Sequence, residues 1–123
     1  MSCYEGLLEL YKVTGNPLYL SVVEKTVGHI VREEINECWY GGKERQTQPT
    51  YHTMETCVTF TWMQLCNRLL QMTGNSLYAD YMETAIYNAL MASLKADASQ
   101  IAKYSPLEGW RHEGEEQCGM HIN

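Results

Sequence analysis

Two residues near the middle of the chain, Glu55 and Cys57, are of types that bind zinc. A carboxylate and a thiolate together suit this metal. Residues two apart point about 200° away from each other in a helix, whereas in an extended chain they face the same way. The two side chains can therefore share a metal only if the segment is extended or is just entering a helix. The alternative is that Glu55 is an acid in the first helical turn and Cys57 a core residue.

A second set of candidate ligands, His112, Cys118 and His121, lies near the C-terminus. Cys118 and His121 are separated by two residues, a spacing common among zinc ligands. Cys118 and His121, together with Glu55 and Cys57, would complete a four-ligand site within this chain. The alternative is that a chain with four histidines places two of them in its tail by chance.

Glu44 is the candidate general acid/base, because it lies in the segment Trp-Tyr-Gly-Gly-Lys-Glu-Arg at 39–45. A carboxyl group on a glycine-rich loop can approach a glycosidic oxygen while a neighbouring aromatic ring stacks on the sugar. The alternative is a solvated surface charge, since a lysine and an arginine flank this glutamate.

An internal repeat defines the elements that must position these residues. The segment 10–19 recurs 59 residues later as 69–78, and each copy contains Thr-Gly-Asn. The glycine can end one helix in the left-handed conformation. Asn16 can then cap the next helix, and Asn75 or Ser76 can do so in the second copy. Apolar residues at helical spacing flank both copies. The predicted helices cover about 3–14, 17–35, 55–73 and 76–95.

These helices predict an all-α fold with two antiparallel hairpins, 3–35 and 55–95. A long loop over 36–54 is expected to be functional, and the tail over 102–123 is expected to be irregular or to form short strands. Neither hairpin can bury its apolar stripe alone, so the repeat predicts stacking in a solenoid or a closed (α/α) barrel. Helix faces left exposed in this way predict self-association of the chain.

Composition excludes several other classes. The net charge of −6, with nine scattered Lys and Arg, gives no footprint for nucleic acid. No apolar run approaches the roughly 18 residues of a membrane span, and no signal peptide is recognisable, so a soluble chain of undefined compartment is expected. Phosphate-loop, serine-hydrolase and His-Glu-x-x-His motifs are absent. The five cysteines do not suggest a disulfide scaffold, and Cys66 is expected to be a buried thiol.

These motifs occur in an order that resembles glycoside hydrolase family 127, the zinc-dependent β-L-arabinofuranosidases first catalogued as a domain of unknown function. The likeness extends through essentially the whole chain, and its most specific element is Glu-x-Cys before a Trp- and Leu-rich helix. The matching motifs are Tyr4-Glu5-Gly6-Leu7, Tyr40-Gly41-Gly42, Glu55-Thr56-Cys57, Tyr87-Asn88 and Tyr104-Ser105-Pro106-Leu107-Glu108.

The resemblance implies that the two hairpins are part of an (α/α)6 catalytic barrel that acts on a carbohydrate and binds zinc. It implies that Glu55 and Cys57 are zinc ligands, that Glu44 is the acid/base, and that Tyr104 belongs to the sugar-binding segment. The family nucleophile is one of two adjacent cysteines, which the family places after 120–123, and this chain has no such pair.

We therefore expect a parent protein that is a retaining glycosidase of plant-type oligosaccharides, removing terminal β-L-arabinofuranosyl or a related sugar. The 123-residue chain alone is expected to be inactive. The loop between Glu44 and Glu55 is shorter than in the arabinofuranosidases. This difference affects the assignment of Glu44 as the acid/base and the identity of the substrate. Two alternatives remain open at this point: a non-catalytic helical-repeat binding module, and a zinc-free (α/α)-barrel carbohydrate enzyme such as a sugar epimerase or a uronate-processing hydrolase.

Overall fold

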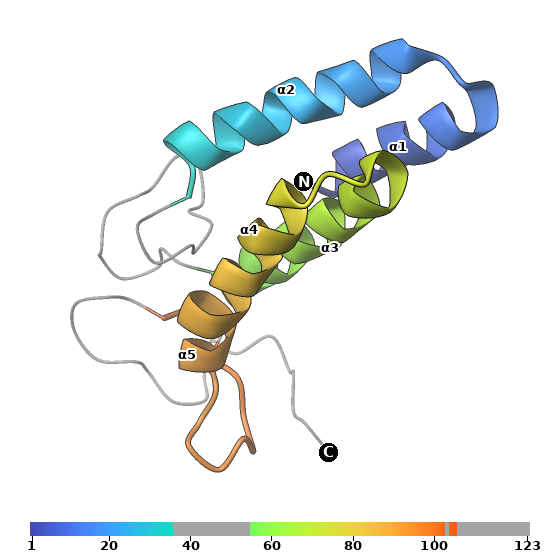
Figure 1. Ribbon diagram of the computed structural model, residues 1–123. Coiled ribbons are helices and arrows are strands. Elements are labelled where there is room, and N and C mark those ends of the chain that lie inside the picture. The colour runs from blue at the N-terminus through green and yellow to red at the C-terminus, as the bar shows by residue number, and fades with distance from the viewer. Residues whose placement is uncertain (36–54, 103, 106–123) are drawn as a thin grey trace.

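The computed structural model describes residues 1–35, 55–102, 104 and 105, and it is helical in nearly all of its regular structure (Figure 1). The part so described contains isolated β-bridges and no strand. The all-α fold class expected from the sequence is therefore confirmed. The helices are α1 (Ser2–Thr14), α2 (Pro17–Glu33), α3 (Thr56–Thr73), α4 (Leu77–Ala85), the π-helix η1 (Ile86–Leu90) and α5 (Met91–Ser93).

Each hairpin turns at Thr-Gly-Asn, and the two turns have the same hydrogen bonds. Gly15 and Gly74 both take φ 66°, and each amide donates 2.8 Å to the carbonyl four residues earlier. The side chains of Asn16 and Asn75 each accept a 3.0 Å bond from the amide two residues later. These are the helix stop and the helix cap predicted from the repeat.

The two hairpins pack against each other through α1 and α3, which run in the same general direction (Figure 1). One continuous core forms at this contact, and Trp62 of α3 packs its ring 5.8 Å from that of Tyr81. The core therefore joins both hairpins rather than lying within either one. Its buried members are Leu8, Val23, Val27, Ile30, Trp62, Leu65, Cys66, Leu69, Tyr78 and Ala85.

Polar groups bridge the two hairpins at the border of this core. The Arg68 guanidinium on α3 lies 2.8 Å from the Glu5 carboxylate on α1 and also pairs with Glu9. The Tyr78 hydroxyl on α4 donates to the Glu24 carboxylate on α2, and burial together with this negative neighbour raises the pKa of Tyr78. These bonds fix which faces of the hairpins meet.

The last helix differs from the single regular helix expected over 76–95. It is α-helical up to Ala85, widens to a π-helix over Ile86–Leu90, and ends at Ser93. In the π-helix the Met91 amide donates to the Ile86 carbonyl, five residues earlier. The extra residue in this turn changes the helix face on which Ser93 lies.

Several expectations fall on residues outside the described part of the chain. These are the loop 36–54 with Glu44, and the tail beyond 105 with His112, Cys118 and His121. Within the described ranges, none of the helices has the length and hydropathy that crossing a membrane requires.

The repeat provides a matched test of the shared core. Leu69 is fully buried, whereas its repeat equivalent Leu10 is 46% exposed. Leu69→Ala should lower the free energy of unfolding by about 2–5 kcal/mol, because it leaves a cavity between the hairpins. Leu10→Ala in dilute solution should cost less than about 1 kcal/mol. Urea denaturation followed by circular dichroism measures both, and equal losses would contradict a core shared in this way.

Candidate active site at the start of α3

The site begins at Glu55, the residue that precedes α3. Its backbone is extended, with φ −70° and ψ 122°, and its carbonyl accepts the first helical bonds from the amides of Val58 and Thr59 at 3.0 and 3.3 Å. The carboxylate makes no capping bond to the helix. Glu55 thus lies where a helix begins, and Cys57 follows in the first turn. This is the local geometry that a shared metal requires of two residues at this spacing.

Glu55 also pairs with a segment far away in the sequence. It forms an antiparallel β-bridge with Tyr104, so two of the four residues singled out by the family resemblance lie side by side. Both side chains are half-buried. Cys57 is also half-buried, one residue beyond Thr56. The start of α3 therefore brings together every predicted site residue that falls within the described residues.

Thr56 holds the Tyr104 segment in place. Its hydroxyl is buried and donates a 2.6 Å bond to the Ala102 carbonyl. It lies 3.1 Å from the Ser93 hydroxyl, which itself donates to the Ala89 carbonyl at 2.8 Å. The Ala102 amide donates 2.8 Å to the Ser93 carbonyl. Thr56 and Ser93 thus tie the start of α3, the end of α5 and the chain at 102 together.

The π-helix determines where Ser93 lies. Ala85, Ala89 and Ser93 are all buried, at successive intervals of four residues. In a regular α-helix four residues advance about 40° beyond a full turn, so the third position of such a series would rotate away from the first. The wider π-turn absorbs this excess and keeps the three on one face. Ser93 consequently reaches Thr56.

Three buried polar atoms near α3 have no hydrogen-bond partner among the described residues: Thr59 Oγ1, Trp62 Nε1 and Ser105 Oγ. Buried polar groups are normally paired. Ser105 directly follows Tyr104, and Thr59 lies one turn after Glu55.

The chemistry of Glu55 and Cys57 fits zinc in part. The donor types suit the metal, and Glu55 keeps its carboxylate uncommitted to capping. No group of three or more potential ligands exists within the described residues. The described part of the chain thus contains two candidate zinc ligands, whereas structural sites use four and catalytic sites three with an open position. Whether Cys118 or His121 joins them lies outside the described residues.

Cys66 does not belong to this site. It is fully buried in the shared core, and burial raises the pKa of its thiol to about 12. A thiol held neutral in this way is neither a metal ligand nor a nucleophile. The sequence-based expectation of a buried thiol at this position is confirmed.

Thr56 and Ser93 are the residues of the site that the sequence interpretation missed. In the sequence Thr56 stands out only as the middle residue of Glu-x-Cys. Ser93 lies four residues after Ala89 in an otherwise apolar stripe, and a hydroxyl in such a stripe is the signal that could have identified it. Glu44, the predicted acid/base, lies outside the described residues.

The fold and this site define the class of protein: an all-α chain of stacked helical hairpins with candidate site residues at the end of one hairpin. The sequence model described as β-L-arabinofuranosidase, GH127 catalytic domain, matches residues 31–120. The chain belongs to this family of glycoside hydrolase catalytic domains, and its hairpins are part of an (α/α) barrel. No curated protein and no solved structure matches the chain.

The role of Thr56 is tested by removing its hydroxyl. Thr56→Val keeps the side-chain shape but leaves the Ala102 carbonyl without its donor, which should cost about 1–3 kcal/mol. The same substitution should also speed up hydrogen exchange at the Ala102 amide, because the segment that carries this amide is held less firmly. Thr26→Val is the control, because that hydroxyl bonds only to the Val22 carbonyl of its own helix. Unchanged exchange at Ala102 in the Thr56 variant would show that other contacts hold the segment.

Proposed function

We propose that this chain contributes part of the active site of a retaining glycosidase that releases terminal β-L-arabinofuranosyl or a related sugar from plant-type oligosaccharides. Membership of the family supports the hydrolase class. The observation that carries the proposal is the bridge between Glu55 and Tyr104. It joins a proposed metal ligand to a proposed sugar-pocket residue, although the two are distant in the sequence.

In this proposal Glu55 and Cys57 hold zinc. When bound, the metal would keep thiolate sulfur ionised at neutral pH. The extended backbone of Glu55 and the first-turn position of Cys57 support this role. Thr56 lies between these two residues in the sequence, and its side chain is buried. It acts as a positioning residue, because its hydrogen bond to the Ala102 carbonyl fixes the segment that leads to Tyr104.

Glu44 is the proposed general acid/base. The nucleophile of the parent protein, which the resemblance assigns to one of two adjacent cysteines, attacks the anomeric carbon while a carboxylic acid at this position protonates the departing glycosidic oxygen. The resulting carboxylate then activates the water that displaces this nucleophile and releases the sugar. The two steps invert the anomeric centre twice, so its configuration is retained. The half-buried ring of Tyr104 supplies an amphipathic surface of the kind that sugars stack on or hydrogen-bond to.

Zinc binding distinguishes the proposed ligands from bystanders. A chelator-washed chain that offers two ligands should take up zinc weakly. Cys57→Ser and Glu55→Gln should each lower that affinity at least about tenfold. The matched control is Cys3→Ser, since Cys3 is an exposed thiol at the start of α1. Equilibrium dialysis with metal analysis measures all four proteins.

Two results of this experiment would contradict the proposal, the first on the ligands and the second on the expected weak binding. Equal zinc affinity in the wild type and both site variants would remove Glu55 and Cys57 as ligands. Tight binding of one zinc per wild-type chain would show that the ligand set closes among these residues or within a self-associated pair, with Cys118 and His121 as the first candidates for substitution.

The activity of the chain alone provides a separate test. The resemblance assigns the nucleophile to one of two adjacent cysteines, and the sequence contains no such pair. Purified chain supplied with zinc should therefore release no sugar from a synthetic β-L-arabinofuranoside above the rate of a heat-denatured sample. Robust hydrolysis would show that another residue of this chain acts as the nucleophile.

A further inference from the structure

Because the two hairpins repeat with an offset of 59 residues, each position in one hairpin has an equivalent in the other. Their turns agree bond for bond, so contacts within a hairpin are matched at equivalent positions. A position that is buried in one hairpin and exposed in the other is therefore covered by the neighbouring hairpin. The faces through which hairpins stack are therefore those whose equivalent residues differ in exposure.

One face of the second hairpin, here called its back face, is covered by the first. Leu69 is fully buried, while its equivalent Leu10 is 46% exposed. Met72 and Tyr81 both pack against the core. Their equivalents Val13 and Val22 are 83% and 40% exposed. The back face of the first hairpin is thus an apolar surface with nothing in the described part of the chain upon it.

The opposite face, the front face, shows the reverse pattern. In the first hairpin its residues are buried or half-buried, and several of them belong to the core shared with the second hairpin. In the second hairpin it forms an open groove of about 240 Å³. Residues lining the groove are Phe60, Met63, Gln64, Asn67 and Met82. Their equivalents in the first hairpin are Met1, Tyr4, Glu5, Leu8 and Val23.

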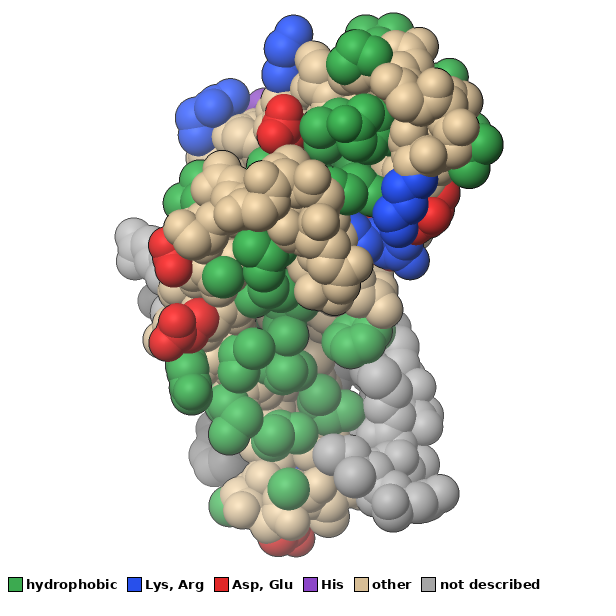
Figure 2. Space-filling view, turned by 45° about the vertical axis from the view of Figure 1, so that its right-hand side comes forward, with side chains coloured by type: hydrophobic (Ala, Val, Ile, Leu, Met, Phe, Trp, Pro, Cys, Tyr) green, Lys and Arg blue, Asp and Glu red, His purple; other side chains and the backbone are tan. Residues whose placement is uncertain are grey.

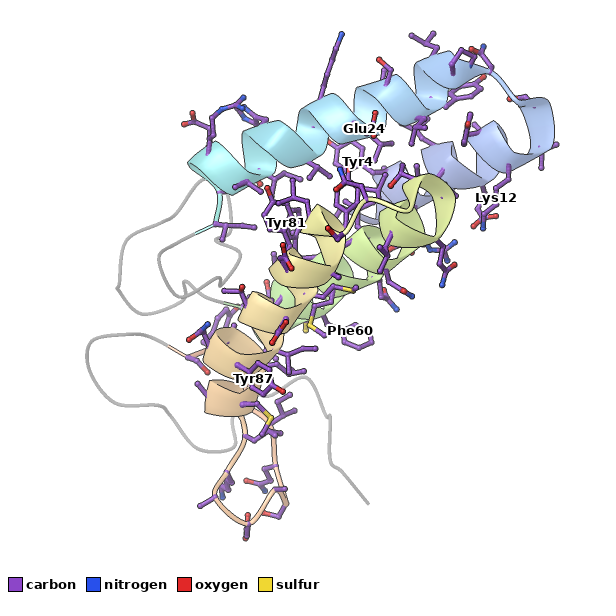
Figure 3. The ribbon with its side chains drawn as sticks, viewed as in Figure 1. Tyr4, Lys12, Glu24, Phe60, Tyr81 and Tyr87 are labelled. Atoms are coloured by element: carbon purple, nitrogen blue, oxygen red, sulfur yellow. The ribbon has the colours of Figure 1, made fainter. Side chains whose placement is uncertain are left out.

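The lining of this groove is apolar and accessible. Leu8 and Val23 are fully buried in the first hairpin, whereas Phe60 in the groove is 53% exposed. Phe60 projects from α3 away from the first hairpin (Figure 3). Hydrophobic side chains also gather on this side of the second hairpin, above the loop that follows α5 (Figure 2). The front face of the second hairpin is thus the surface on which a back face fits.

The polar groups at the two open faces are complementary as well. Within the chain, Tyr78 on a back face donates to Glu24 on a front face. The equivalents on the open faces are Tyr19 and Glu83, which preserve the same donor and acceptor.

We propose that the front face of the second hairpin binds the back face of the first hairpin of another copy of this chain. The contact repeats the stacking of the two hairpins within the chain, with Phe60, Met63 and Met82 against Leu10, Val13 and Val22. Because different faces meet, the association is head-to-tail and does not close at a dimer. The wild-type chain should therefore grow in mass with concentration.

Two single variants test the proposal by blocking one face each. Phe60→Glu blocks the front face, and Val22→Glu blocks the back face; both side chains are exposed, so a carboxylate at either site stays in contact with water. Each variant alone should sediment as a monomer at concentrations where the wild type is larger. Val13→Glu serves as a second back-face variant, and circular dichroism verifies that all three retain their helices.

The decisive measurement mixes the two single variants. Each retains one intact face, so an equimolar mixture should form a dimer and nothing larger. A mixture that stays monomeric would overturn the proposal. So would a back-face variant that still dimerises, which indicates a symmetric contact, or association that survives both substitutions. A monomeric wild type would assign the front face to a further hairpin of the same barrel instead of a second copy.

Discussion

Burial of α3 from two sides is the constraint on which the rest of the structure depends. Its core residues Trp62, Leu65 and Leu69 are almost completely inaccessible to solvent, and α3 contacts both α1 and α4. Removal of this much apolar surface from water supplies stabilisation that neither hairpin can obtain alone. Because α3 begins immediately after Glu55, the same packing that stabilises the chain also positions the candidate site at the end of the helix.

The candidate site is fixed by interactions of a different kind from those of the core. Hydroxyl and carbonyl groups, not apolar side chains, hold the segment around Ala102 on α3. Buried hydrogen bonds of this kind require precise geometry, and an unpaired partner is costly. A polar anchor therefore specifies one position for Tyr104 beside Glu55, whereas apolar contact alone would tolerate several. The apolar core provides stability, and the polar anchor provides the register of the site.

Local features of the fold could be predicted from the sequence, and contacts between distant segments could not. The Thr-Gly-Asn turns were predictable because a left-handed glycine and an asparagine cap act within a few residues. The burial of Cys66 followed from its place in a helical stripe. The pairing of Glu55 with Tyr104 depends on the path of the intervening hairpin, which no local pattern encodes. The π-helix was missed because its residues fit an α-helical stripe equally well. Zinc binding by Glu55 and Cys57 and the role of Glu44 stay predictions.

The π-helix gives this part of the chain an unusual evolutionary constraint. Deleting one residue from Ile86–Leu90 would restore a regular α-helix, which is locally the more favourable structure. It would also rotate everything that follows by about 100°, and Ser93 would turn away from Thr56. Substitutions in this turn alter single side chains, whereas a change in its length uncouples the helix from the segment that carries Tyr104. Related domains should therefore vary here in residue type while conserving the number of residues.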